Sequence, residues 1–72
     1  MITFSLRGEY IELNKLLKAT NLCPSGGAAN QAIIQGLVKV NGELETRKTG
    51  KIRAGQQVEF DGNVISVEKE SS

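Results

Sequence analysis

The sequence predicts an α+β fold in which two short N-terminal helices pack on a small, bent, mostly antiparallel sheet. Apolar residues recur with the helical period between residues 11 and 36, and then with the period of two that is typical of strands. One strand, two helices and about four or five short strands in hairpins give a layer of helices on one sheet. The 72 residues are expected to form one domain, residues 1–72, around a single small core.

The first strand and the first helix are predicted from short apolar patterns. Thr3–Leu6 alternates polar and apolar residues before the turn-prone Arg7-Gly8, which favours a strand. A helix is expected from Ile11 to Ala19, because its leucines recur at positions i, i+3 and i+4 and would be buried together: Leu13, Leu16 and Leu17. It should end before Pro24, since a proline disfavours helical geometry in the residue that precedes it.

A second helix is expected to begin after Ser25. This serine follows Pro24 and precedes another periodic run, so its hydroxyl can accept a hydrogen bond from an unpaired N–H of the first turn. One face of the helix holds small or medium apolar residues, which allow close packing: Ala29, Ala32, Ile33 and Gly36. Gly36 can adopt the left-handed conformation that ends a helix.

The remaining chain is expected to form hairpins. Val38 and Val40 point one way and Lys39 the other, until Asn41-Gly42 provides a strong hairpin signal before a returning strand over residues 43–46.

A second hairpin is predicted at Asp61-Gly62, where a two-residue turn would place Val58 opposite Ile65. Residues 68–72 are polar and are expected to form a disordered tail.

Charge is distributed unevenly in a chain whose formal net charge is +1. Residues 37–53 carry a net +3, whereas residues 54–72 carry −3. Four cations and no acid fall within the segment Thr46–Arg53, which we call the basic segment: Arg47, Lys48, Lys51 and Arg53. Such a cluster attracts phosphate groups, while the acidic end argues against indiscriminate coating of nucleic acid.

The composition argues against catalysis and against a metal or cofactor. The chain contains no histidine, which removes the usual general base and the commonest metal ligand. Cys23 has no histidine partner and no second cysteine, so we interpret it as a small core residue. Glu43 and Glu45 alternate on an exposed strand and are expected to be solvated.

Two further features bear on ligand type. Gly26-Gly27 at a helix start can expose N–H groups to a phosphate, although the same glycines equally suit close packing of the turn. Phe4 and Phe60 fit core positions, which leaves no platform on which bases of a single strand would stack. A bound nucleic acid would therefore be recognised by shape and phosphates, as in folded RNA or a duplex.

The ordered set of residues resembles the RNA-binding domain first described in ribosomal protein S-four, whose two-helix and hairpin core is called the αL motif. The resemblance covers roughly residues 11–60 and includes the helix leucines, the Ser25 cap and Gly36-x-Val38-x-Val40-Asn41-Gly42. The run Glu45-Thr46-Arg47-Lys48-x-x-Lys51-Ile52-x-x-Gly55-Gln56 is most similar to the small stand-alone bacterial YbcJ-like family.

The resemblance implies a non-catalytic module that binds structured RNA, with ribosomal RNA as one candidate, through the hairpin loop and the start of helix two. The implied RNA-binding residues are Ser25, Gly26, Gly27, Asn30, Gln31, Lys39, Arg47, Lys48, Lys51 and Arg53. Many relatives carry basic residues on helix two, where this chain has neutral ones. We therefore expect a weak, salt-sensitive contact, or one that needs a second protein partner.

Two other functions compete with RNA binding. A protein-interaction adaptor could use the same basic face against an acidic partner, and this alternative stays open. A β-grasp carrier of sulfur or a modifier is disfavoured, because the ending Glu70-Ser71-Ser72 lacks the Gly-Gly terminus of such carriers. No segment approaches the ~20 apolar residues of a membrane span, and no signal peptide is evident. We expect a monomeric cytoplasmic protein without a membrane partner.

Overall fold

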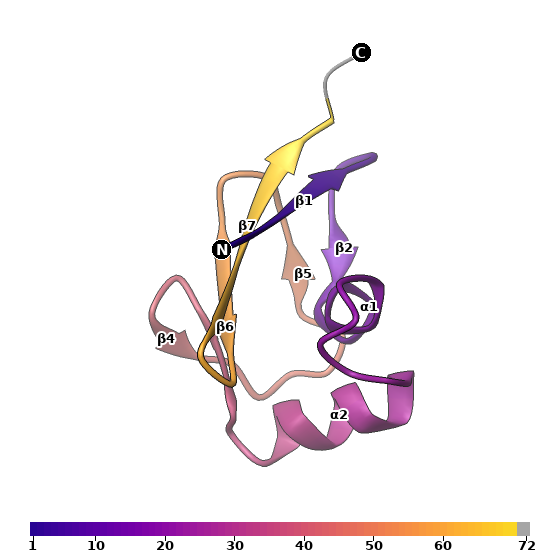
Figure 1. The fold of residues 1–72 in the computed structure, drawn as a ribbon, viewed down its shortest axis with the longest axis vertical. Coiled ribbons are helices and arrows are strands. Elements are labelled where there is room, and N and C mark those ends of the chain that lie inside the picture. The colour runs from indigo at the N-terminus through magenta and orange to yellow at the C-terminus, as the bar shows by residue number, and fades with distance from the viewer. Residues whose placement is uncertain (71–72) are drawn as a thin grey trace.

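The computed structural model describes residues 1–70 and shows two helices beside a bent five-stranded sheet and a smaller two-stranded one (Figure 1). The elements are β1 (Ile2–Leu6), β2 (Ile11–Glu12), α1 (Leu13–Ala19), α2 (Gly26–Ile34), β3 (Val38–Val40), β4 (Glu43–Leu44), β5 (Lys51–Ile52), β6 (Gln57–Phe60) and β7 (Asn63–Lys69). The predicted α+β class is confirmed.

The five-stranded sheet has the order β1-β7-β6-β3-β4. Its neighbours are antiparallel except for β1 and β7, which run parallel, with Phe4 level with Val67. Figure 1 shows these first and last strands side by side. The predicted register of Val58 opposite Ile65 is confirmed, and both side chains are buried.

The first helix begins two residues later than predicted. Ile11 and Glu12 form β2, which pairs antiparallel with β5 so that Ile11 lies level with Ile52. The helical period extends over Ile11, but pairing with a distant strand decides its conformation. From Leu13 onward the prediction is confirmed, because the leucines at 13, 16 and 17 are fully buried.

The second helix begins and ends as predicted. Ser25 is its N-cap and accepts a hydrogen bond at Oγ from the backbone N–H of Ala28 (3.1 Å). Gly36 follows the helix with φ = +78°, the left-handed conformation that favours glycine. The small face is buried against the rest of the domain, through Ala29, Ala32 and Ile33.

Replacing the capping serine should destabilise the domain. The Ser25→Ala substitution leaves the N–H of Ala28 without its partner, which costs about 1 kcal/mol of unfolding free energy. In a domain of this size that loss lowers the melting temperature by roughly 4–8 °C. Thermal unfolding followed by circular dichroism would measure it, with Ser5→Ala on exposed β1 as the matched control; equal shifts in both variants would contradict the capping role.

Both predicted hairpin turns are present. Asn41 and Gly42 have φ values of +52° and +81°, and Asp61 and Gly62 have +51° and +79°. Positive φ at both central residues is the turn geometry that matches the twist of paired strands. The strand that returns from the first turn is shorter than predicted, since β4 ends at Leu44.

The C-terminal tail is ordered further than predicted. Strand β7 continues through Lys69 because it pairs with β1, and the N–H of Glu70 donates to the carbonyl of Leu6 (3.0 Å). The Glu70 carboxylate also lies 3.0 Å from Nε of Arg7. The expected disorder from residue 68 is therefore corrected for residues 68–70, while residues 71–72 lie outside the described part of the chain.

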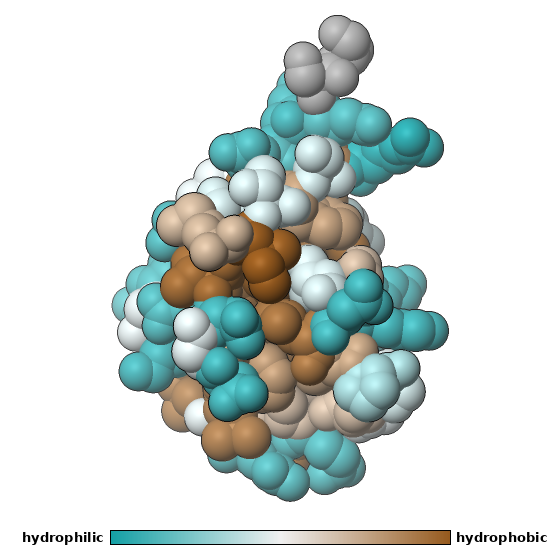
Figure 2. All heavy atoms as spheres, in the orientation of Figure 1, coloured by the Kyte–Doolittle hydropathy of each residue, from teal (hydrophilic) through white to brown (hydrophobic). Residues whose placement is uncertain are grey.

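The core lies between the helices and the concave side of the sheet. Its buried residues are Leu6, Leu13, Leu16, Leu17, Cys23, Ala29, Ala32, Ile33, Val38, Ile52, Val58, Ile65 and Val67. Phe4 and Phe60 pack against it while remaining partly exposed. Figure 2 shows apolar side chains reaching the surface in the middle of the drawn face, with hydrophilic residues around them.

Cys23 belongs to this core, as predicted. The residue is 4% exposed, and burial raises the pKa of its thiol. A buried, protonated thiol is a weak nucleophile. Among residues 1–70, no helix is both long and apolar enough to cross a membrane.

Candidate nucleic-acid interface

The basic segment is docked on the start of helix α1 by two backbone hydrogen bonds. The N–H of Leu13 donates to the carbonyl of Gly50 (2.9 Å), and the N–H of Asn14 donates to the carbonyl of Lys48 (3.1 Å). These bonds satisfy N–H groups that a helix start leaves unpaired, in place of a side-chain cap. The segment therefore has a fixed backbone.

The cations of the segment project outward from this backbone. Lys48, Lys51 and Arg53 are all exposed, whereas Ile52 between the last two is 2% exposed. Alternation along the strand places Lys51 and Arg53 on the side opposite Ile52. The structure thus lines up three cations from the start of α1 along β5.

Arg47 differs from the other cations of the segment because its guanidinium forms an ion pair with a glutamate. Glu45 accepts hydrogen bonds from the backbone N–H of Arg47 (2.9 Å) and from its Nε (3.2 Å). These hydrogen bonds lower the pKa of the Glu45 carboxyl, so it stays ionised. The prediction of a solvated Glu45 is wrong, and its carboxylate partly neutralises the Arg47 guanidinium.

Gly50 allows the chain to turn tightly beside this pair. Its N–H donates to the carbonyl of Arg47 (3.2 Å), and a Cβ on Gly50 would lie only 3.3 Å from that carbonyl oxygen. A side chain at this position would require that carbonyl to shift by a few tenths of an ångström.

Helix α2 is connected to the basic segment through Asn14. The Asn14 Nδ2 donates to Oδ1 of Asn30 (2.9 Å), while the Asn14 backbone is bonded to Lys48. Asn30 is half-buried as a result, and Gln31 is exposed. The structure therefore brings the second turn of α2, the start of α1 and the basic segment together.

Close packing does not require the two glycines at the start of α2. A Cβ on Gly26 would meet no atom within 4 Å, and one on Gly27 would meet only Oγ of Ser25 at 3.9 Å. The packing interpretation is therefore wrong for both. Their unsubstituted backbone leaves the first turn of α2 open to a ligand, since early N–H groups of a helix lack intrahelical partners.

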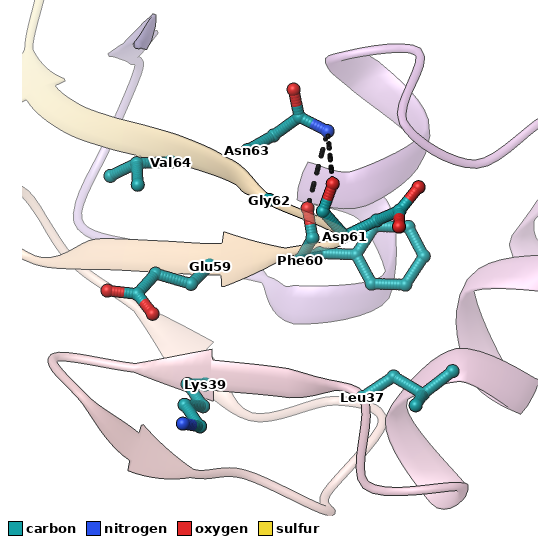
Figure 3. A pocket seen from close by; sticks show the side chains of 8 residues that line it. All are labelled: Leu37, Lys39, Glu59, Phe60, Asp61, Gly62, Asn63 and Val64. Carbon is teal, nitrogen blue, oxygen red and sulfur yellow. Dashed lines mark hydrogen bonds between the residues drawn. The ribbon is translucent and has the colours of Figure 1, made fainter.

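Lys39 lies apart from the other predicted site residues. It is level with Glu59 across β3 and β6, and its neighbours Val38 and Val40 turn toward the core. Lys39 therefore projects from the sheet face opposite the helices. There it lines a shallow pocket of about 330 Å³ together with Glu59 and Asp61, whose carboxylates repel phosphate (Figure 3).

Three residues beside the basic segment were missed from the sequence. Tyr10 is 42% exposed, and the Nζ of Lys51 lies 4.9 Å from the centre of its ring. Asn14 bridges α1 and α2, and Lys15 is exposed on α1 while paired with Glu12 at 2.8 Å. Only the pairing of β2 with β5 places Tyr10 here, and no local pattern indicates that pairing.

Within residues 1–70, this surface presents cationic and amide side chains and no cluster of metal ligands. No group of three or more His, Cys, Asp or Glu residues within that range is placed to hold a metal ion. The only cysteine is buried away from this face. Exposed ammonium, guanidinium and amide donors remain, and these are the groups that contact phosphates.

Comparison with known proteins identifies the family of the chain. The sequence matches the S4 domain family over residues 4–68. It is 48% identical over 68 residues to the Escherichia coli K12 protein named "Putative RNA-binding protein YbcJ", covering 93% of this chain and 97% of that protein. It is also 43% identical over 54 residues to a tyrosine–tRNA ligase from Cupriavidus pinatubonensis, but covers only 13% of that enzyme.

The fold of the chain is also similar to that of a solved structure. The solution structure of Escherichia coli YbcJ, whose description attributes to it an αL motif involved in RNA binding, superposes with a TM-score of 0.74. The match covers 94% of this chain and 87% of that one, at 48% sequence identity. Together with the two-helix and hairpin arrangement described above, these findings show that the chain belongs to the S4 domain family, with the αL motif that YbcJ also contains.

Proposed function

We propose that this chain is a non-catalytic module that binds structured RNA through the basic segment and the start of helix α2. The observation that carries the proposal is the docking of the segment on α1 and, through Asn14, on α2. This docking forms one surface from parts that are distant in sequence. Lys48, Lys51 and Arg53 supply its exposed charge, and Arg47 supplies less because Glu45 holds it.

Structured RNA suits this surface better than an unpaired strand does. Side chains read double-stranded RNA mainly by its shape and by its phosphate and 2′-hydroxyl groups. The surface offers three exposed cations on a backbone bonded to α1, together with the open first turn of α2, which can donate N–H groups to a phosphate. Ribosomal RNA is one abundant ligand of this kind. In this proposal the protein acts in the cytoplasm as a monomer.

The salt dependence of RNA binding tests the proposal. If the surface neutralises about four phosphates, log affinity should fall with log salt at a slope of roughly −3 to −4. Between about 50 and 200 mM salt, the affinity would then fall about a hundredfold. Fluorescence anisotropy with a labelled RNA duplex would measure the slope.

Two results would count against RNA binding. Affinity for the duplex that does not change with salt would mean that no phosphate is neutralised. A partner protein that stays bound to the chain after complete nuclease digestion, with no RNA bound to the purified chain, would instead support the adaptor.

A further inference from the structure

Tyr10 is the one aromatic residue whose ring lies beside the basic segment. It is 42% exposed and directly precedes β2. Tyr10 directly precedes Ile11, which pairs with Ile52 of the basic segment. The ring lies beside this segment, with the ammonium of Lys51 at 4.9 Å from its centre.

This arrangement matches the two parts of a nucleotide. A base presents a flat π-face that stacks on an aromatic ring, and its phosphate presents a negative charge that binds an ammonium group. The ammonium of Lys51 lies over the ring of Tyr10, so a stacking base takes the opposite face of the ring or displaces this exposed lysine toward its phosphate. A base pair inside a duplex cannot do so, because its faces are covered by neighbouring pairs.

Two acids lie close to Tyr10 in sequence, Glu9 directly before it and Glu12 two residues after it. Glu12 is paired with Lys15 at 2.8 Å, which partly neutralises its charge. The hydrogen bond and charge of Glu12 raise the pKa of Lys15, and Tyr10 adds a smaller effect in the same direction. Lys15 therefore stays protonated, and its charge offsets that of Glu12, which leaves Glu9 as the other acid adjacent to Tyr10 in sequence.

We propose that Tyr10 and Lys51 form a binding site for one unpaired nucleotide at the margin of the RNA interface. The inference rests on the proposed function and narrows it to a class of ligand. That class is an RNA helix with an unpaired nucleotide next to it, such as a bulge or a single-nucleotide overhang. The sequence-based expectation that the chain has no stacking residue is revised at this one position.

The test compares three RNAs with the same duplex: one blunt, one with a single 3′ adenosine overhang and one with an abasic overhang. Base stacking on an aromatic ring strengthens binding by about tenfold. We expect that gain for the adenosine overhang over the other two. The abasic overhang carries the extra phosphate without the base, so it separates stacking from added charge.

Intrinsic fluorescence gives a direct second readout. Tyr10 is the only tyrosine and the chain has no tryptophan, so the emission at tyrosine wavelengths comes from this ring. We expect the adenosine overhang to quench it more strongly than the blunt or abasic RNA does at equal saturation. Equal quenching by all three RNAs would overturn the proposed stacking.

Two substitutions at Tyr10 and one control complete the experiment. Tyr10→Phe keeps the ring and should keep the preference for the adenosine overhang. Tyr10→Leu should remove that preference, so that the ratio of affinities for the adenosine overhang and the blunt duplex falls to about one. The control, Leu44→Ala, removes a side chain that is 60% exposed and lies outside the interface, so it should preserve the preference for the adenosine overhang.

The outcomes separate this inference from the proposed function. Salt-dependent binding of all three RNAs with equal affinity would overturn the nucleotide site and leave the proposed function intact. No binding of any of the three would overturn both.

Discussion

Reversing two charges of the basic segment, with Lys48→Glu and Lys51→Glu together, is expected to weaken duplex RNA binding by at least about a hundredfold at low salt. Each hydrogen bond to a charged group is worth about 1.5–3 kcal/mol, and each reversal also adds repulsion of the phosphates. The magnitude of the salt slope should fall by about two, because two fewer phosphates are neutralised. Anisotropy titrations at several salt concentrations would measure both quantities.

The matched control reverses two lysines elsewhere, with Lys39→Glu and Lys69→Glu. It changes the net charge of the protein by the same amount. Lys39 projects from the opposite face of the sheet beside Glu59, and Lys69 lies at the end of β7. Charges separated by more than about 10 Å are largely screened at 0.1 M salt, so we expect a loss of less than about threefold.

The comparison of the two double variants decides between a site and a general charge effect. Equal losses in both would show that the RNA responds only to net charge, and the basic segment would not be the interface. A single Arg47→Glu variant should weaken binding less than a single Lys48→Glu variant. The reason is that Glu45 already neutralises part of the Arg47 charge.

Features decided by neighbouring residues could be predicted from the sequence. The Ser25 cap depends on an N–H three residues away, and the turn at Asn41-Gly42 depends on two residues that tolerate positive φ. The register of Val58 opposite Ile65 follows from the length of one turn. In each case the interaction that fixes the structure lies within one turn or hairpin.

Features decided by distant pairing could not be predicted in the same way. Strand β1 pairs in parallel with β7, and β2 pairs with β5 across about forty residues, and neither pairing leaves a local pattern. The pairing of β1 with β7 carries the ordered chain to Glu70, beyond the predicted end. The pairing of β2 with β5 makes the first helix shorter than predicted. The second pairing also brings Tyr10 to the basic segment.

The candidate site shows the same division. The cations of residues 47–53 are visible as a cluster in the sequence, so their presence near the interface was predicted. The sequence did not predict that Arg47 is less free than the other cations to contact a ligand, because this depends on the hydrogen bonds between Arg47 and the Glu45 carboxylate. Lys39 shows the limit of assigning sites by proximity in sequence, since the alternation of β3 turns it away from the helices.

Replacing Ile52 with alanine is expected to lower the free energy of unfolding by about 2–5 kcal/mol. Ile52 is 2% exposed, lies level with Ile11 and is the buried residue of β5. A domain of this size has a total stability of roughly 4–11 kcal/mol, so the loss is a large share of it. Urea unfolding followed by far-ultraviolet circular dichroism would measure the change.

The control for this variant is Leu44→Ala, which removes an aliphatic side chain that is 60% exposed. Surface substitutions of this kind change stability by less than about 0.5 kcal/mol. Similar unfolding midpoints for both variants would mean that β5 contributes little to the core. In that case the backbone of the basic segment would be held by its bonds to α1 and its pairing with β2, without a contribution from the packing of Ile52.

Strand β5 also connects the stability of the domain to the proposed RNA interface, because Ile52 is buried between the exposed Lys51 and Arg53. RNA that binds only the folded chain should stabilise the Ile52→Ala variant by about 2.7 kcal/mol at a free concentration of 100 times its Kd. If the loss of Ile52 also loosens the two flanking cations, Kd itself rises, and the same RNA concentration stabilises the variant less than the wild type. Urea unfolding at one fixed RNA concentration would reveal that difference, and equal stabilisation of both proteins would show that the interface does not depend on the packing of β5.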